Sequence, residues 1–371
     1  MTLMRVAFLL TQDRGGPVDV TVRLAAMLHD TGECEVRVFG PTPARDASLL
    51  GDRHEEVVVP GKGSLGAIRW TRSVLRAWRP DIVHAQDRRS GLVVAGMQRG
   101  RTGPRVAVHT YHGVPDDVCE SWFQREPGAP GPSNYTKAVL AADALVARTV
   151  SRTVVPSSAM GDFLHHRLRV DRNRLAHIDN GVLLPTAAAP TGPVRKLLFV
   201  GLLVPRKGLL DLLTALGRQT VMPSDATLTV VGDGPERVEA ERMASLPALA
   251  GRVNFLGFRS DVAAIMTAHD ALVLPSRLEQ QPLVIAEAMG AGKPVVATRT
   301  GGVPEMLTLP DAPNYLVPPG DVDALAASLQ RLFDDPDPGG LGARLAARAA
   351  ARYSAEACAS SHLTLYRGLF T

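Results

Sequence analysis

Short apolar runs recur along this chain, and each is followed by a polar or glycine-containing loop and then by a segment with helical periodicity. Strands of a parallel sheet read as such runs, because helices cover both faces of the sheet. The runs lie at 6–10, 35–40, 57–59, 81–85, 106–111 and 144–147, and then at 197–201, 227–232, 253–257, 271–275 and 295–298. The pattern predicts an α/β protein with two Rossmann-like, doubly wound domains that face a central cleft.

The segment 185–194 is rich in proline and contains no charged residue, which is typical of a linker. A chain of 371 residues is long for one hydrophobic core, so two domains are expected. We expect an N-terminal domain at 1–184, a C-terminal domain at 195–350 and a C-terminal helix at 351–371. Whether that helix crosses back to the N-terminal domain stays open.

The composition limits the partners. The net charge of +4 comes from arginine, with only five lysines, and no stretch interleaves basic and aromatic residues as nucleic-acid-binding segments do. Three scattered cysteines and the absence of a signal-peptide pattern indicate a cytoplasmic protein. The helix at 67–79 gathers arginines on one face. We favour an amphipathic helix that covers the sheet with its arginines in water, and peripheral membrane contact stays open.

Two glutamates, Glu279 and Glu287, lie eight positions apart, the first after an apolar strand and the second on an apolar helix. A single acidic residue before a helix is usually a cap, and Pro282 at the first helical position fits that interpretation. A carboxylate at Glu287, between Ala286 and Ala288, is costly unless a partner meets it. Two carboxylates at this spacing suit the vicinal hydroxyls of a ribose and a sugar.

A second motif follows the strand at 197–201. Arg206 and Lys207 precede the apolar helix at 209–216. The first turn of a helix has free backbone N–H groups and the positive end of the helix dipole, so it favours anions. With two cations beside it, this helix start suits a diphosphate.

These motifs resemble the E-x7-E segment of retaining, nucleotide-sugar-dependent glycosyltransferases with the GT-B fold, glycosyltransferase family four. The similarity covers nearly the whole chain. Gly15 and Gly16 match the family's glycine pair beside the diphosphate, and His112-Gly113 matches the histidine-glycine near the donor sugar. The Asn-Gly-Val turn at 180–182 and the glycine turn at 232–235 also match.

The resemblance implies a retaining glycosyltransferase that moves a sugar from a nucleotide-diphosphate donor, of UDP-sugar or GDP-mannose type, to a hydroxyl acceptor. That acceptor could be a small molecule, a lipid or a glycan. The implied catalytic residues are His112, Lys207 and Glu279. The implied donor-binding residues are Gly15, Gly16, Arg206, Lys207, Phe258, Glu279, Gln281, Leu283, Val284 and Glu287. No cofactor and no metal are expected, and the D-x-D pairs at 321–323 and 335–337 are interpreted as helix caps.

Two departures keep alternatives open. Leu202 stands where the family usually has an arginine for the diphosphate, and Arg206 is the candidate substitute. Pro282 lies in the loop between the glutamates and has no backbone N–H to donate to a sugar. A catalytically silent nucleotide-binding scaffold therefore remains an alternative. A nucleotide-sugar epimerase or hydrolase of the same fold is the other alternative.

Overall fold

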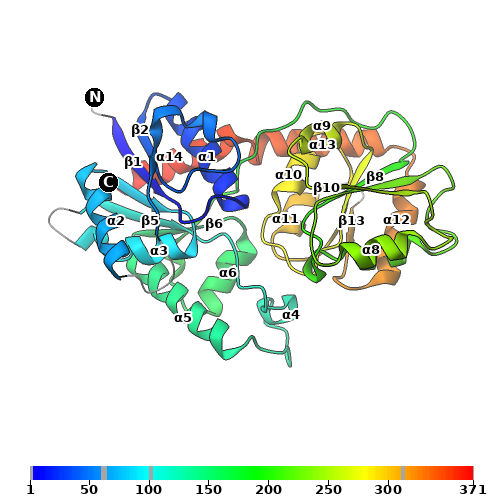
Figure 1. The fold of residues 1–371 in the computed structure, drawn as a ribbon, viewed down its shortest axis with the longest axis horizontal. Helices are drawn as coiled ribbons and strands as arrows, with labels where there is room; N and C mark the ends of the chain where they lie inside the picture. The colour runs from blue at the N-terminus through cyan, green and yellow to red at the C-terminus, as the bar shows by residue number, and fades with distance from the viewer. Residues whose placement is uncertain (1–2, 60–64, 100–102, 311–313, 371) are drawn as a thin grey trace. The chain divides into compact units, whose positions relative to one another are not determined.

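The computed structural model of the chain describes residues 3–59, 65–99, 103–310 and 314–370 (Figure 1). The chain divides into two compact units. Unit 1 contains Met1–Val182 and Ala355–Thr371, and unit 2 contains Leu183–Ser354. The chain therefore leaves unit 1 after Val182 and returns to it at Ala355, and the two boundaries differ from the expected 184/195 and 350/351.

The described strands of unit 1 form one parallel sheet in the order β3-β2-β1-β4-β5-β6-β7. Their bounds are β1 (Met4–Leu9), β2 (Cys34–Gly40), β3 (His54–Glu56), β4 (Ile82–Ala85), β5 (Val106–Thr110), β6 (Arg152–Val155) and β7 (Leu175–His177). The strand order reverses between β1 and β4, so the connections run outward from this point on both sides. This arrangement is the doubly wound topology that the apolar runs predict.

The described helices of unit 1 cover its sheet (Figure 1). The α-helices are α1 (Gly16–Asp30), α2 (Leu65–Ala77), α3 (Arg88–Val94), α4 (Glu120–Phe123), α5 (Asn134–Thr149), α6 (Ser158–His166) and α14 (Ala355–Gly368). Short 3-10 turns are η1 (Ala47–Leu49), η2 (Gly51–Arg53), η3 (Met97–Arg99) and η4 (Arg172–Arg174). The last helix, α14, packs on α1 and adds Cys358, Leu363 and Tyr366 to the core that contains β1.

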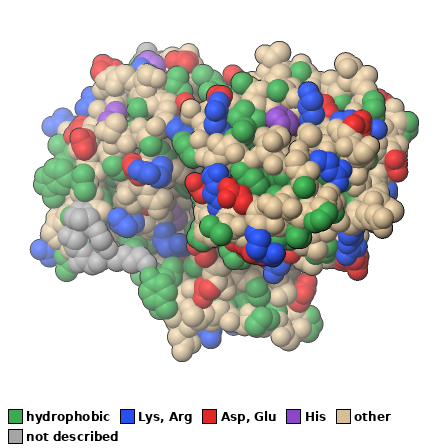
Figure 2. All heavy atoms as spheres, turned by 45° about the vertical axis from the view of Figure 1, so that its right-hand side comes forward, with side chains coloured by type: hydrophobic (Ala, Val, Ile, Leu, Met, Phe, Trp, Pro, Cys, Tyr) green, Lys and Arg blue, Asp and Glu red, His purple; other side chains and the backbone are tan. Residues whose placement is uncertain are grey.

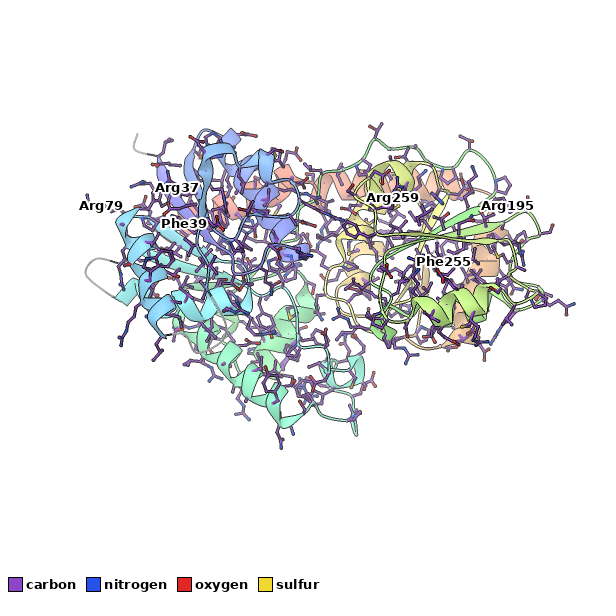
Figure 3. All side chains as sticks on the ribbon, in the orientation of Figure 1. Arg37, Phe39, Arg79, Arg195, Phe255 and Arg259 are labelled. Atoms are coloured by element: carbon purple, nitrogen blue, oxygen red, sulfur yellow. The ribbon has the colours of Figure 1, made fainter. Side chains whose placement is uncertain are left out.

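A second core cluster lies under α2 and α3 and contains Phe39 of β2, which is labelled in Figure 3. Its ring meets that of Trp78 edge-on, with the ring centroids 5.9 Å apart. The expected arrangement of α2 is partly wrong. Trp70 of α2 is exposed, so this large apolar side chain does not cover the sheet. Arg72, which we expected in water, donates hydrogen bonds to the backbone oxygens of Val93 (2.7 Å) and Ala95 (2.9 Å). The helix is therefore fastened to α3 by an arginine.

Two predicted strands of unit 1 are wrong. Residues 144–147 lie in α5, where Leu145 is 60% exposed while Ala144, Val146 and Ala147 are buried, as on one face of a helix. Residues 57–59 follow β3 rather than forming it: Val57 and Val59 are buried and Val58 is exposed, as in a strand, but the ladder ends at Glu56. The apolar content of both segments reflects burial, which helices and loops also provide.

The described strands of unit 2 form a second parallel sheet in the order β10-β9-β8-β11-β12-β13. Their bounds are β8 (Lys196–Val200), β9 (Thr227–Val231), β10 (Val253–Gly257), β11 (Ala271–Leu274), β12 (Val295–Thr298) and β13 (Tyr315–Val317). The helices are η5 (Pro205–Lys207), α7 (Leu209–Leu216), α8 (Arg237–Ala244), α9 (Val262–Thr267), α10 (Leu283–Gly290), α11 (Val303–Leu307), α12 (Val322–Phe333) and α13 (Pro338–Arg352). The order reverses between β8 and β11.

The proline-rich segment is held by unit 2. The backbone N–H of Ala188 donates to the oxygen of Ala291 (2.9 Å), and the Lys293 ammonium donates to the oxygen of Ala188. A Cβ on Gly339 would lie 2.4 Å from the oxygen of Pro190. Hydrogen bonds therefore attach the segment to the rest of unit 2, to which it belongs.

On the face of the molecule shown in Figure 2, basic and acidic side chains are interspersed. Exposed ion pairs of the chain include Arg242–Glu239 and Arg259–Asp261. Such pairs contribute little to stability because water screens them. No helix in the described part of the chain is long and apolar enough to cross a membrane.

Candidate functional site

In open parallel sheets, ligands bind beyond the carboxyl ends of the strands at the place where the strand order reverses. In unit 2 this place is set by β8 and β11, and the loops that follow them are 201–208 and 275–282. These loops contain Arg206, Lys207 and Glu279. The topology therefore brings together two motifs that are about seventy residues apart in the sequence.

The loop after β8 ends at Gly208, which has φ 71° and precedes the first turn of α7. A Cβ at Gly208 would lie 2.2 Å from the backbone oxygen of Pro275, so only glycine fits here. This close approach joins the two loops and places Arg206 and Lys207 immediately before the amino end of α7. The helix start and the two cations make up the anion-binding arrangement predicted from the sequence.

An ion pair between Lys207 Nζ and Glu279 Oε1 joins the loops. The two side chains are only 17% and 11% exposed, so the pair is largely withdrawn from water. The backbone N–H of Arg277 also donates to the oxygen of Arg206 (2.7 Å). One cation thus stays at the helix start because a carboxylate fixes it there, and the ammonium has further N–H groups for an anionic ligand.

The remaining residues of the two-glutamate segment lie at and after the start of α10. Pro282 is the N-cap residue and the helix begins at Leu283, one position later than expected. Gln281 is buried, and Leu283, Val284 and Glu287 are half-buried. Leu283 and Glu287 are four positions apart and share one face of the helix. The first N–H groups of α10 and the Glu287 carboxylate are therefore presented by one short helix.

Phe258 is set apart from these residues. It follows the edge strand β10, which lies two strands away from β8 in the sheet, and its side chain is 71% exposed. Lys207 and Glu279 follow β8 and β11, so β9 lies between the strand that precedes Phe258 and the strands that precede this pair. Phe258 is nevertheless an exposed aromatic ring at the carboxyl edge of the same sheet.

In unit 1 the reversal lies between β1 and β4. Gly15, with φ 106°, is the N-cap of α1, and Gly16 is its first residue. The nearest atom to a Cβ built on Gly15 is Pro17 Cδ at 3.9 Å, so the backbone here is open to approach. The glycine pair thus lies after β1 and at a helix start, as predicted.

His112 follows β5, the neighbour of β4, and is half-buried. Its Nε2 donates to Gln86 Oε1 at 3.1 Å. Burial, together with the nearby His109 and His362, lowers the pKa of His112 to about 3, so the ring is neutral at pH 7. A neutral imidazole in this place can orient a hydroxyl and carries no charge of its own.

Sequence reasoning missed the residues that hold His112. Gln86, Asp87 and Arg88 directly follow β4, and Asp143 of α5 pairs with Arg88. One signal was available, since three consecutive polar residues follow a buried strand there. Apart from Ser90, however, the partners of these side chains lie 23 to 76 positions away along the chain, and no local pattern reveals such pairs.

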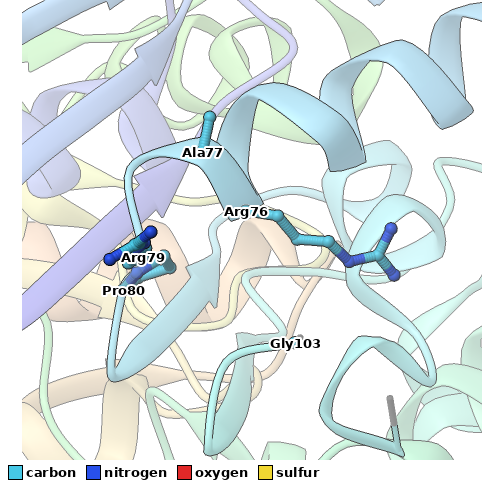
Figure 4. A pocket seen from close by; sticks show the side chains of 5 residues that line it. All are labelled: Arg76, Ala77, Arg79, Pro80 and Gly103. Atoms are coloured by element: carbon cyan, nitrogen blue, oxygen red, sulfur yellow. The ribbon is translucent and has the colours of Figure 1, made fainter. Parts of the chain in front are cut away.

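Other features do not join these sites. A hollow lined by Arg76, Ala77, Arg79, Pro80 and Gly103 precedes β4 and β5, at the amino edge of the unit 1 sheet (Figure 4). That edge is opposite to the one that carries the glycine pair and His112. Asp321 and Asp337 accept hydrogen bonds from the N–H groups of Ala324 and Gly340, which confirms their interpretation as helix caps.

Comparison with known proteins agrees with this geometry. Residues 14–184 match the family model described as Glycosyltransferase Family 4, and residues 194–335 match the model described as Glycosyl transferases group 1. The chain is similar to a glycogen synthase of Mycobacterium tuberculosis, with 29% identity over 268 residues. It is also similar to a 2-deoxystreptamine glucosyltransferase of Streptomyces kanamyceticus, with 37% identity over 142 residues.

These matches cover 70% and 38% of this chain, and 62% and 36% of the two relatives, so the chain spans less than two thirds of either relative's length. Among solved structures, Anabaena HepE in complex with UDP superposes with a TM-score of 0.80 at 21% identity, over 98% of this chain and 100% of that one. Sucrose-phosphate synthase from Thermosynechococcus elongatus gives 0.76 at 23% identity, with 99% of both chains covered. Both halves of the chain thus match glycosyltransferase family models, and the chain has the fold and domain make-up of a GT-B glycosyltransferase.

Proposed function

We propose that this protein transfers a sugar from a nucleotide-diphosphate donor, of UDP-sugar or GDP-mannose type, to a hydroxyl acceptor, with retention of configuration and without a metal. The observation that carries the proposal is the Lys207–Glu279 ion pair beside the start of α7, where the strand order of unit 2 reverses. A fixed ammonium at a helix start is suited to the charge that develops on a departing diphosphate. The relatives and the UDP complex of Anabaena HepE support the donor class.

In the proposed reaction, the bond between the anomeric carbon and the diphosphate oxygen breaks, and a bond from the acceptor oxygen to that carbon forms on the same face. The acceptor's proton passes to the departing phosphate oxygen, so no separate base is needed. Lys207, Arg206 and the α7 N–H groups stabilise the phosphate charge. Because these groups are fixed before the reaction, they need no reorganisation when the charge appears.

The other residues are assigned to the nucleotide and the sugar. Glu287 is proposed to bind the ribose hydroxyls. Glu279, Gln281 and the first N–H groups of α10, from Leu283 and Val284, are proposed to bind the sugar. Phe258 is proposed to contact the base. In unit 1, the backbone of Gly15 and Gly16 and the ring of His112 are proposed to act on the diphosphate and the sugar.

The first test measures thermal stabilisation of the purified protein by UDP, GDP and ADP. A ligand at a hundred times its dissociation constant should add about 2.7 kcal/mol to the free energy of unfolding. Lys207→Ala and Glu287→Ala should lose the shift. Lys196→Ala, which removes an exposed lysine at the start of β8, is the matched control and should keep it. If no nucleotide stabilises the unaltered protein, the donor site is wrongly assigned.

The second test follows turnover of the donor that the first test identifies. Incubation with acceptor mixtures in EDTA should yield an α-linked product from an α-linked donor, which supports both retention and metal independence. Isomerised sugar or free sugar without any acceptor would instead favour an epimerase or a hydrolase. Nucleotide binding without turnover would favour a silent scaffold.

A further inference from the structure

Three consecutive residues after β4, namely Gln86, Asp87 and Arg88, each hold a different part of unit 1. They lie where the strand order reverses, with β4 paired to β1 on one side and to β5 on the other. This turn is therefore next to the loop after β1 and the loop after β5. Those two loops carry the glycine pair and His112.

Gln86 holds the ring of His112. Its side chain is 1% exposed, and its backbone N–H is shared between Leu9 O (3.1 Å) and Ser90 Oγ (3.0 Å). Gln86 Oε1 can only accept, so the hydrogen bond to His112 Nε2 requires a proton on that nitrogen. In the neutral ring, Nδ1 then carries the lone pair. The bond thus fixes both the orientation of the ring and its tautomer.

Arg88 holds the backbone beside that ring. Its guanidinium donates to Gly113 O at 3.1 Å, and its Nε lies 2.8 and 2.9 Å from the two carboxylate oxygens of Asp143. Asp143 is 2% exposed and also accepts from the Tyr111 hydroxyl at 2.8 Å. Burial and the Asp143 carboxylate raise the pKa of Tyr111, so its hydroxyl stays a donor. Residues 111 and 113, on both sides of His112, are therefore held by one network.

Asp87 holds the other loop. Its carboxylate accepts from the backbone N–H of Thr11 (2.6 Å) and from the Thr11 hydroxyl (2.8 Å). The same carboxylate caps α3 through the N–H of Ser90 (2.8 Å). The loop between β1 and Gly15 is thus anchored at Thr11. The turn at 86–88 therefore anchors both the loop after β1, which leads to Gly15, and the loop after β5, which carries His112.

We propose that Gln86 and Arg88 are positioning residues for the transfer reaction. Gln86 holds His112 as the Nε2–H tautomer, with its Nδ1 lone pair available to a hydroxyl of the donor sugar, and Arg88 holds the backbone beside the ring. This inference rests on the proposed function, in which His112 orients the donor sugar. An error of about 1 Å in such a group can cost about 100-fold in rate. The base, the ribose and the cations for the diphosphate are assigned to unit 2, and the loop that carries Gly15 and Gly16 is held by the side chain of Asp87. Loss of the Gln86 or Arg88 side chain should therefore lower kcat and leave nucleotide binding unchanged.

The test uses the full-length protein and four variants. Gln86→Leu removes the acceptor with little change in size, and Gln86→Glu keeps an acceptor oxygen in either protonation state. Arg88→Lys keeps the positive charge, but the lysine ammonium cannot bond to Asp143 and Gly113 at once, as the planar guanidinium does. Arg72→Lys is the matched control, since Arg72 is also a half-buried arginine of unit 1 that donates to two backbone oxygens.

We expect Gln86→Leu and Arg88→Lys to lower kcat by about 10- to 100-fold, with the donor KM and the nucleotide thermal shift unchanged. Gln86→Glu should recover most of the kcat, and Arg72→Lys should not change it. A second readout is the tautomer of His112, measured by two-bond correlations in the 15N-histidine-labelled protein and assigned with His112→Ala. Gln86→Leu should lose the Nε2–H signature, whereas Arg88→Lys should keep it.

The outcomes separate the two levels of the proposal. If kcat is unchanged in both Gln86→Leu and Arg88→Lys, or if Arg72→Lys lowers it equally, the positioning role is refuted. If Gln86→Leu keeps the Nε2–H signature, Gln86 does not set the tautomer. If the unaltered protein binds nucleotide but turns over no donor, the proposed function fails instead, and the positioning role fails with it, whatever the ring spectra show.

Discussion

Lowering the pH from 7 to 5 should destabilise unit 1, because three histidines are buried there without charge. His84, His109 and His362 are 0%, 2% and 3% exposed. Burial lowers the pKa of His109 and of His362 to about 4, and lowers that of His84 well below its ordinary value. His84 is held between the Tyr366 hydroxyl and Thr110 Oγ1, both at 2.7 Å.

The sign follows from the protons that each state binds. An unfolded histidine takes up a proton as the pH falls through about 6.5, whereas these folded histidines take it up only near pH 4 or below. Their stabilising contribution is therefore complete above pH 6.5 and is lost as the pH falls toward 4. At pH 5 each one lowers the free energy of unfolding by about 2 kcal/mol, out of a typical total of about 5–15 kcal/mol.

Tryptophan fluorescence during urea unfolding measures this effect, because all three tryptophans (Trp70, Trp78 and Trp122) belong to unit 1. His362→Phe keeps an aromatic ring but cannot be protonated, so the pH dependence should become shallower by up to about 1.4 kcal/mol per pH unit. His29→Gln changes an exposed histidine and is the control. An unfolding free energy that stays constant from pH 7 to 5, or an unchanged slope in His362→Phe, would refute the reasoning.

Three further predictions concern unit 2 and are read by calorimetry. Lys207→Met should destabilise the unit by about 3 kcal/mol because the Glu279 carboxylate is left unpaired, and adding Glu279→Gln should recover part of the loss; a single variant as stable as the unaltered protein would contradict the burial of the pair. Gly208→Ala should cost about 1–3 kcal/mol more than Gly251→Ala. Both glycines have positive φ, but only at Gly208 would the new Cβ meet a backbone oxygen, so equal losses would show that the contact with Pro275 does not matter. Asp321→Ala should cost about 1 kcal/mol by removing the cap of α12 and should leave nucleotide binding intact, whereas a lost nucleotide shift would reopen a ligand role for this aspartate.

The site residues could be named from the sequence to different extents. Lys207 and Glu279 stand in local patterns, a strand followed by a basic loop and a strand followed by an acidic loop. Gln86 and Arg88 also follow a strand, but their importance depends on the contacts with His112, Gly113 and Asp143. A local pattern reports which residues lie at a strand end, and it does not report which neighbour they meet.

The sequence by itself determined the layered α/β architecture, because burial of parallel strands requires apolar runs and the chain provides them in two series. It predicted β8 to β12 closely, yet it assigned a strand to 144–147 and missed β6, β7 and β13. β7 and β13 are three residues long, which is too short to show a period. β6 is as long as β11 and β12, but only Val154 and Val155 form its apolar run.

Only the tertiary structure decided which strand ends become neighbours. The order of strands in a sheet is set by long-range pairing and packing, and these forces leave no local trace in the sequence. The pairing of β8 with β11 brings Lys207 to Glu279, and the pairing of β4 with β1 and β5 brings Gln86 and Arg88 to His112 and Gly113. The tertiary structure also places α14, the last helix of the chain, in the core of unit 1, where the Tyr366 hydroxyl meets the ring of His84.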